Sequence, residues 1–217
     1  MEVYVLPLSV SQKQFWYREI MFTGNTAYHI PIGLNLLGDL DFTLLEKCFR
    51  YIINRHEILR TTFALENGEP VQLVRSEQQF HLQHRNLELP PEKWSDYDRL
   101  LTIKKILEDE SRQLFDLIKG PLLRATLYKI SNKEHILLVN LHHIISDGWS
   151  LGIFIQELTQ LYASRGEISL PELPIQYGDY AEWQETYLQT QRIQDQLAYW
   201  QKKLALPLPI VDLFTVR

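Results

Sequence analysis

The chain has 217 residues, of which 45% are hydrophobic and 12% aromatic, and its formal net charge is −5. This length suffices to bury the core of one globular domain, although two small domains would also fit. The acidic balance excludes the basic footprint of a nucleic-acid-binding protein, and no apolar run approaches the ~20 residues that cross a bilayer.

The single cysteine, Cys48, excludes an internal disulfide and is typical of a reducing compartment. The first patterned segment follows the N-terminus almost at once, so we expect no signal peptide. Together these features predict a cytoplasmic protein.

The first half of the chain alternates helix-like and strand-like segments. A helix is expected over residues 11–22, and a second helix follows Asp41, whose carboxylate suits an N-terminal cap. One apolar stripe marks this second helix and predicts packing against a core: Leu44, Leu45, Cys48, Phe49, Ile52 and Ile53. Strands are expected over residues 28–37, 59–65, 70–74 and 80–85. Asn67-Gly68 joins the middle pair into a hairpin.

The second half continues this alternation. A loop is expected over residues 89–91, and Ser95 then caps a helix that runs to about residue 116. The other expected elements are strands over residues 122–130 and 134–141, a helix from residue 149, a surface connection over 164–174, a long amphipathic helix over 177–204, and a proline-broken apolar tail over 206–211. We therefore predict an α/β (α+β) fold, a mixed sheet with helices packed on it, in one domain over residues 1–217.

One segment, His-His-Ile-Ile-Ser-Asp-Gly, stands where a buried strand meets a turn and begins with His142. Side chains alternate along a strand, so His142 and His143 should point to opposite faces and are not expected to act as twin bases. Asp147-Gly148 is a turn signal, and Ser146 or Asp147 can cap the following helix. At this segment a chemical role is favoured over packing alone.

Histidine suits a reactive site because its ordinary pKa, about 6.5, lets it accept a proton near neutrality. A positioned general base is worth roughly two to four powers of ten in rate. The backbone amides of Gly148 and Trp149 would face a developing oxyanion at the start of the helix. The alternative is a pair of satisfied core histidines with Asp147 as a helix cap, which the Asp-Gly spacing makes the weaker interpretation.

Metal binding by His142, His143 and Asp147 is a third interpretation. Adjacent strand residues face apart, the chain has no further cluster of cysteine and histidine, and the spacing matches no common zinc pattern. The sequence therefore disfavours a metal centre.

The stretch LHHIISDGWS (141–150) resembles the HHxxxDG motif of the condensation domains of nonribosomal peptide synthetases. These domains belong to an acyltransferase superfamily that includes chloramphenicol acetyltransferase. Three more segments match family motifs in the family's order: LPLSVSQKQFWY (6–17), RHEILRTTF (55–63) and YGDYAEW (177–183). Four ordered matches are a far more specific signal than one pattern.

The resemblance implies a role for each residue of the third motif. His143, the second histidine, is expected to deprotonate or orient an amine that attacks an acyl thioester, with His142 beside it in the catalytic segment. Asp147 is expected to hold the loop by pairing with an arginine. Gly148 is expected to let backbone and substrate approach closely.

Candidate substrate-binding residues are Arg60, Ser146 and Trp149. Arg60 is the final arginine of the second motif, which lies near the active-site channel in relatives. Without the resemblance, Arg60 and the charged residues before it would be interpreted as the end of a helix and the start of a strand.

The resemblance also implies a chloramphenicol acetyltransferase-like two-layer sandwich, of which this chain matches the N-terminal half. The implied reaction forms an amide (peptide) bond between an acyl or peptidyl thioester and an aminoacyl amine, both held on phosphopantetheine arms of carrier proteins. No cofactor or metal is expected on the domain itself. Expected partners are peptidyl or acyl carrier proteins and the missing C-terminal half, or a second copy, but neither nucleic acid nor membrane.

Other interpretations stay open at this point. An epimerisation domain or a standalone acyltransferase would share the histidine motif. A catalytically incompetent half could act as a docking or scaffold module, and two copies could complete one another in a dimer. The chain itself could be a fragment of a longer protein or a truncated gene product.

Overall fold

The computed structural model describes residues 2–87 and 95–208. Its helices in these ranges are α1 (Val10–Met21), α2 (Phe42–Arg55), the 3-10 helix η1 (Glu57–Arg60), α3 (Asp96–Ser111), α4 (Gly148–Ala163), α5 (Tyr177–Leu188) and α6 (Gln191–Lys203). The strands are β1 (Val3–Pro7), β2 (His29–Leu37), β3 (Thr61–Glu66), β4 (Glu69–Arg75), β5 (Gln83–Asn86), β6 (Leu123–Ser131) and β7 (Glu134–His142).

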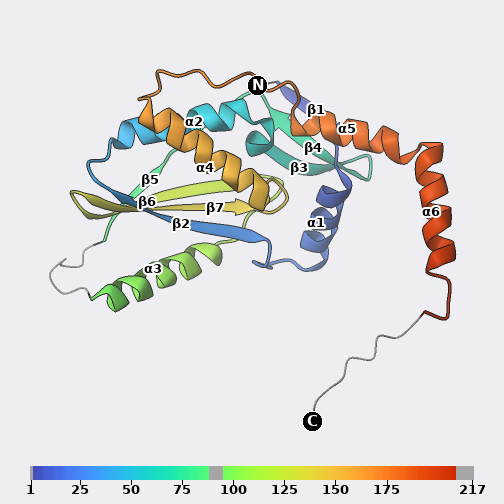
Figure 1. Ribbon diagram of the computed structural model, residues 1–217, viewed down its shortest axis with the longest axis horizontal. Coiled ribbons are helices and arrows are strands. Elements are labelled where there is room, and N and C mark those ends of the chain that lie inside the picture. Colours follow the sequence, from blue (N-terminus) through green and yellow to red (C-terminus); the bar gives the residue numbers. More distant parts are fainter. Residues whose placement is uncertain (1, 88–94, 209–217) are drawn as a thin grey trace, which may run out of the picture.

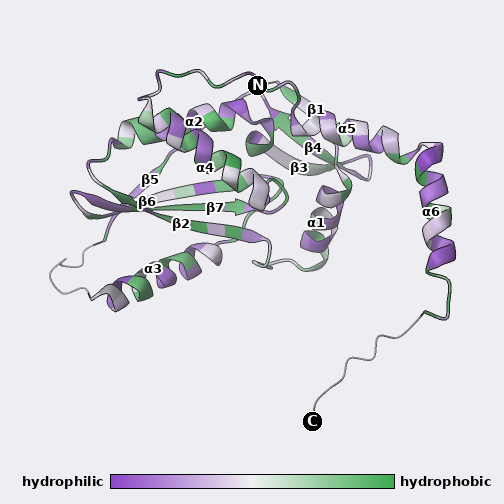
Figure 2. Cartoon of the chain, viewed as in Figure 1, coloured by the Kyte–Doolittle hydropathy of each residue, from purple (hydrophilic) through white to green (hydrophobic). Residues whose placement is uncertain are grey.

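β7 lies inside the larger sheet, whose strand order is β2-β7-β6-β5. It pairs antiparallel with β2 and β6, while β5 runs parallel to β6 at the edge. α2 and α4 cover one face of this sheet and α3 covers the other (Figure 1). Because both faces are covered, every residue of β7 after Glu134 is buried, which explains its nearly continuous apolar sequence (Figure 2).

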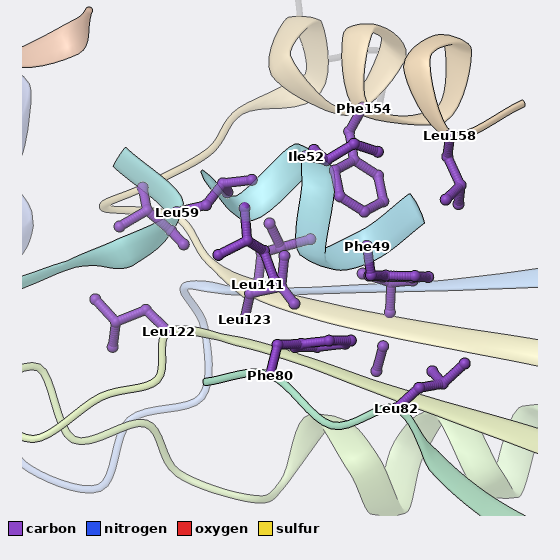
Figure 3. Close-up of a cluster of buried hydrophobic side chains, with 14 of the residues drawn as sticks. Phe49, Ile52, Leu59, Phe80, Leu82, Leu122, Leu123, Leu141, Phe154 and Leu158 are labelled. Atoms are coloured by element: carbon purple, nitrogen blue, oxygen red, sulfur yellow. The ribbon is translucent and has the colours of Figure 1, made fainter. Parts of the chain in front are cut away.

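The main core lies between the larger sheet and the pair α2 and α4 (Figure 3). Phe49 of α2 is fully buried, stacks on Phe80 at a centroid distance of 5.1 Å and meets Phe154 of α4 edge-on at 5.5 Å. Leu141, near the end of β7, lies in the same cluster. The strand that ends at His142 is therefore anchored in the main hydrophobic cluster.

A smaller antiparallel sheet, in the order β1-β4-β3, stands beside the larger one, and α5 packs on β1. Gly178 permits this packing, because a Cβ atom at that position would lie 2.3 Å from Cδ1 of Leu6. The first and fourth motif segments are thus brought together by a close helix–strand contact.

The expected fold class is confirmed, and the predicted hairpin and helix caps are present. Asp41 caps α2, Ser95 caps α3 and Asp147 caps α4, each by accepting a backbone N–H with its side chain. Local signals of this kind place most of the helices to within a few residues.

Several predicted boundaries are wrong. Residues 57–60 form η1 instead of the start of a strand, and the strand predicted from residue 80 is reduced to β5. α3 ends at Ser111, not near residue 116, because the guanidinium of Arg124 binds the carbonyl oxygens of Gln113 and Leu114, which draws the chain out of the helix.

The long C-terminal helix predicted over residues 177–204 is two helices. α5 ends before the polar dipeptide Gln189-Thr190, whose backbone N–H groups donate to the carbonyls of Thr186 and Tyr187. Thr190 has an extended backbone and is the N-cap residue of α6. The loop predicted at 89–91 lies outside the described residues, as does the tail beyond residue 208. Of the helices that the structure describes, none combines the length and the apolarity needed to span a membrane.

Replacing Phe49 by Ala should lower the free energy of unfolding by about 3–5 kcal/mol, because it leaves a cavity between α2, Phe80 and Phe154. Urea unfolding followed by circular dichroism measures this loss. The matched control is Tyr51→Ala on the exposed side of the same helix, which should change stability by no more than about 0.5 kcal/mol. Equal losses in the two variants would contradict the assigned core.

Candidate active site

The backbone at the end of β7 is held from both sides. The N–H of His142 donates to the carbonyl of Leu122 at 3.0 Å, and the N–H of His143 donates to the carbonyl of Tyr28 at 2.8 Å. His142 is the last residue of β7 and His143 begins the turn, and their side chains have different surroundings, as the sequence predicts. His142 is fully buried, whereas His143 is only partly buried.

The side chain of His142 lies in the interior and is not among those that line the cavity beside His143. Its Nδ1 accepts the backbone N–H of Ile144 at 3.0 Å, so in the neutral ring Nε2 carries the proton. Nε2 faces Oε2 of Glu19 at 3.9 Å. Burial, then the nearby His29 and His143, lower the pKa of His142 to about 3, and burial raises the pKa of Glu19.

His143 lines a cavity of about 390 Å³, most of whose surface is apolar. Its imidazole stacks on the ring of Phe15 from α1, with centroids 4.9 Å apart and planes 21° apart. Side chains from the end of α2, from α4 and from α5 complete the wall, including His56, Ile153 and Tyr177. A partly exposed imidazole held flat against an aromatic ring can accept or donate a proton inside this space.

Asp147 lines the cavity and caps α4. Its Oδ1 accepts the backbone N–H of Ser150 at 2.8 Å and the Ser150 hydroxyl at 2.7 Å. The hydroxyl, then the backbone N–H, hold the pKa of the Asp147 carboxyl below its ordinary value, and His143 adds to this effect. Ser146 lines the cavity as well.

Other residues singled out from the sequence lie elsewhere. His142, Gly148, Trp149 and Arg60 are not among the residues that line the cavity in the part of the chain that the structure describes. Trp149 is 82% exposed at the start of α4. Across those same described ranges, no group of three or more His, Cys, Asp and Glu residues is arranged to hold a metal ion.

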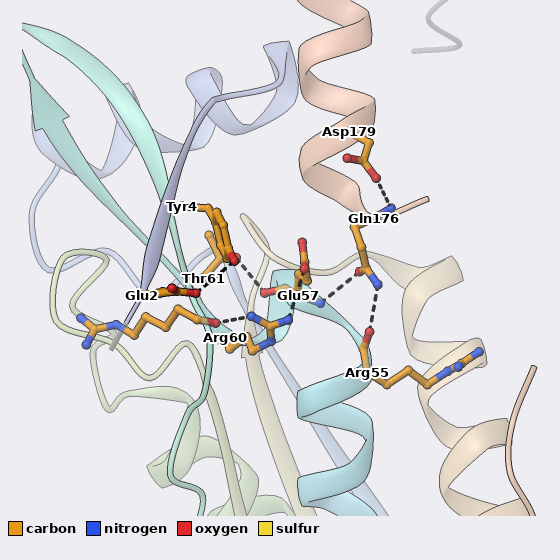
Figure 4. A network of polar contacts seen from close by, with 9 residues as sticks. Glu2, Tyr4, Arg55, Glu57, Arg60, Thr61, Gln176 and Asp179 are labelled. Carbon is orange, nitrogen blue, oxygen red and sulfur yellow. Dashed lines mark hydrogen bonds and ion pairs between the residues drawn. The ribbon is translucent and has the colours of Figure 1, made fainter. Parts of the chain in front are cut away.

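Arg60 is the last residue of η1, is buried, and joins that helix to the smaller sheet. Its guanidinium donates to the carbonyl of Arg75 at the end of β4 and to the carboxylate of Glu57 at 3.3 Å (Figure 4). These contacts pair two nitrogens of the buried cation with main-chain and local partners, while Nε has no hydrogen-bond partner among the described residues.

A buried glutamine pair connects the first motif to the histidine loop, and sequence analysis missed it. Nε2 of Gln12 donates to Oε1 of Gln72 at 3.0 Å and to the carbonyl of Ile144 at 3.5 Å. Ser9, which caps α1 in a capping box with Gln12, also bonds the hydroxyl of Tyr177 at 2.9 Å. The Ser-x-x-Gln spacing was a readable signal for the cap, but not for the tertiary partners.

The second motif also reaches the cavity, through a residue that sequence reasoning assigned to a helix end. His56 lines the cavity, and its Nε2 lies 2.7 Å from Oε2 of Glu157 on α4. Oε1 of Glu157 accepts from Nε of Arg55 at 3.1 Å. The motif segments therefore converge on one space, with α4 fastened to the end of α2.

A family model described as "Condensation domain" matches residues 3–217. One of the linear gramicidin synthase proteins of Brevibacillus parabrevis is 39% identical over 215 residues, which are 98% of this chain and 4% of that protein. Bacitracin synthase 3 of Bacillus licheniformis is 36% identical over 209 residues, which are 95% of this chain and 3% of that protein. The chain thus spans a small fraction of the length of these curated relatives.

Solved structures share the fold. The X-domain in its complex with OxyB from teicoplanin biosynthesis gives a TM-score of 0.81 at 29% identity, covering 98% of this chain and 46% of that chain. The starter condensation domain of rhizomide synthetase gives a TM-score of 0.79 at 19% identity, covering 94% of this chain and 49% of that chain, and shows likeness of fold alone. The chain spans about half the length of each, and the expected chloramphenicol acetyltransferase-like architecture is confirmed.

Replacing Asp147 by Ala should destabilise the protein by about 1 kcal/mol, because the first turn of α4 loses its cap. Asp147→Asn is the matched control, since an asparagine oxygen caps a helix nearly as well as aspartate. Chemical unfolding of the two variants measures the difference. A melting profile of Asp147→Ala identical to that of the wild type would contradict the capping role.

The buried, uncharged state of His142 predicts an acid-sensitive fold. Its pKa of about 3 in the folded state lies below the ordinary ~6.5 of an unfolded chain, so the folded state binds fewer protons and stability falls as the pH drops through this window. His142→Asn keeps an oxygen that can accept the Ile144 N–H but cannot titrate. Between about pH 7 and about pH 5, the free energy of unfolding should therefore fall less in this variant than in the wild type. The difference between the two losses can reach about 1.4 kcal/mol per pH unit. Parallel losses in variant and wild type would count against this assignment.

Proposed function

Because the chain belongs to the condensation domain family, we propose that it carries the histidine-bearing half of a site that joins an acyl thioester to an amine. The observation that carries the proposal is the position of His143, whose imidazole lines the cavity at the end of β7 and stacks on Phe15. Likeness to the gramicidin and bacitracin synthases supports peptide synthesis as the setting.

In the proposed reaction, His143 accepts a proton from the amine as the amine nitrogen attacks the thioester carbonyl carbon. The C–N bond forms as the π electron pair of the carbonyl moves onto oxygen. When this electron pair returns to re-form the carbonyl, the C–S bond breaks, and the departing thiolate takes the proton from His143. A fixed base contributes roughly two to four powers of ten. Alignment of the two substrates contributes several kcal/mol more, because a bimolecular step becomes effectively unimolecular.

The neighbouring residues are proposed to hold this geometry. Asp147 fixes the loop by capping α4, and Ser146 contributes to the cavity wall. The amides of Gly148 and Trp149, expected from the sequence to face a developing oxyanion, belong to residues outside the cavity wall, so we do not propose them as its donors. For His142 we propose a positioning role, and for Arg60 a structural one, since both side chains are buried away from the cavity wall.

We propose that both substrates arrive on phosphopantetheine arms of carrier proteins, so that the prosthetic group belongs to the carriers and the domain itself binds no cofactor. A C-terminal half, or a second copy of this chain, would supply the opposite wall of the channel. The coverage of 46% and 49% of the solved relatives supports the need for such a partner.

A docking or scaffold module without catalysis is the second candidate. Exposed aromatic and aliphatic side chains along α5 and α6 favour it: Trp183, Leu188, Leu197, Tyr199, Trp200 and Leu204. A surface of this kind needs a covering partner, whether or not the cavity performs chemistry.

His143→Ala should abolish amide formation and leave the melting temperature unchanged, because the side chain is partly exposed in a cavity. The assay mixes the chain with acyl- and aminoacyl-carrier proteins, after sedimentation has fixed its mass in solution. His81→Ala, at an exposed histidine outside the cavity, is the matched control and should keep full activity. Full activity in His143→Ala would refute the proposal. An inert wild-type monomer would favour either a fragment that lacks its second half or the scaffold candidate, and turnover by a dimer would favour completion by a second copy.

A further inference from the structure

We propose that His56 is a second substrate-contacting imidazole of the cavity, whose Nδ1 accepts a hydrogen bond from the amine substrate while Glu157 holds its other nitrogen. The inference deepens the proposed function and rests on it, because it names the group that orients the nucleophile toward His143. His56 belongs to the second motif segment, whereas His143 belongs to the third, so the two rings reach the same cavity from different elements.

The ring of His56 is oriented by a buried ion pair. Glu157 of α4 is 8% exposed and binds Nε of Arg55 through one oxygen and Nε2 of His56 through the other, at 3.1 and 2.7 Å. A carboxylate paired with a guanidinium can only accept hydrogen bonds, so Nε2 of His56 carries the proton and donates it. In the neutral ring, Nδ1 then keeps a lone pair.

The backbone around His56 is fixed by one side chain at the start of α5. Nε2 of Gln176 donates to the carbonyl of Arg55 at 3.0 Å, and Oε1 of Gln176 accepts the N–H of Glu57 at 3.1 Å (Figure 4). This amide therefore spans the residues on either side of His56. With both the main chain and Nε2 held, little conformational entropy remains to be lost when a ligand binds Nδ1.

Nδ1 is the part of this ring that remains available to a ligand. The His56 side chain is 20% exposed and lines the cavity, and among the described residues its hydrogen bonding involves Nε2 only. A lone pair in a mostly apolar cavity needs a donor. The attacking amine can donate one of its N–H groups to Nδ1. This hydrogen bond orients the amine nitrogen and leaves its lone pair available to form the amide bond.

A structural pin between α2 and α4 is the competing explanation of the same contacts. His56→Gln separates the two, because the amide nitrogen of glutamine can still donate to Glu157 while the Nδ1 acceptor is lost. If His56 only links α2 to α4, ligand binding should not change in this variant. Contact with the amine predicts weaker binding of ligands that carry an amine.

The test measures binding, so that it does not depend on turnover. The probe is alanine joined to pantetheine through a stable thioether, and its matched control is the propionyl analogue, which has the same shape without the amine. His56→Gln should weaken binding of the amine probe about five- to tenfold, as expected for one lost hydrogen bond, and leave the propionyl analogue unaffected. The surface variant His81→Gln should bind both ligands as the wild type does.

Nuclear magnetic resonance of the chain labelled with ¹⁵N at histidine gives a second readout. The Nδ1 signal of His56, identified by its loss in His56→Gln, should shift with the amine probe and stay in place with the propionyl analogue. Equal weakening of both ligands, no weakening of either, or no binding of the amine probe by the wild type would overturn the inference. Binding as expected without amide formation, even with the second half supplied, would refute the proposed function while still establishing the contact between His56 and the amine.

Discussion

Everything at the cavity depends on the main-chain hydrogen bonds that flank β7 where the strand ends. Leu122 and Tyr28 hold the N–H groups of His142 and His143 from opposite sides, and the N–H of Ile145 turns back to the carbonyl of His142 at 3.0 Å. The chain therefore cannot slip by one residue, which would exchange the buried ring for the exposed one. One imidazole is buried in the interior beside the loop, and the other lines the cavity.

Around this strand end, buried polar side chains join segments that are distant in sequence. Gln12 and Gln72 connect α1, β4 and the loop at Ile144, and Glu157 connects α4 to the end of α2. Such groups are costly to bury unless every partner is in place, so they favour one arrangement of the elements over near alternatives. The buried polar contacts therefore fix the arrangement of the elements around the cavity, whereas the apolar core fills the space between them.

The sequence predicted the fold class, the caps and the divergence of the two histidines, because each depends on local patterns. Asp147 stands at the N-cap position of a helical pattern, and alternation along a strand needs no tertiary information. His56 in the cavity was not predictable in this way, since its partner Glu157 lies 101 residues away. The end of α3 was missed for a related reason: Arg124, on β6, binds the carbonyl oxygens of Gln113 and Leu114 just beyond the helix.

The contacts between the two ends of the chain have a consequence for synthesis on the ribosome. Ser9 bonds Tyr177 across 168 positions, and the backbone N–H of Val10 donates to Gln184 across 174. Residues 9 and 10 must therefore wait until residues 177 and 184 have left the exit tunnel before these contacts can form, and such non-local closure is slow. Until then, the nascent polypeptide exposes the surface of β1 on which α5 packs.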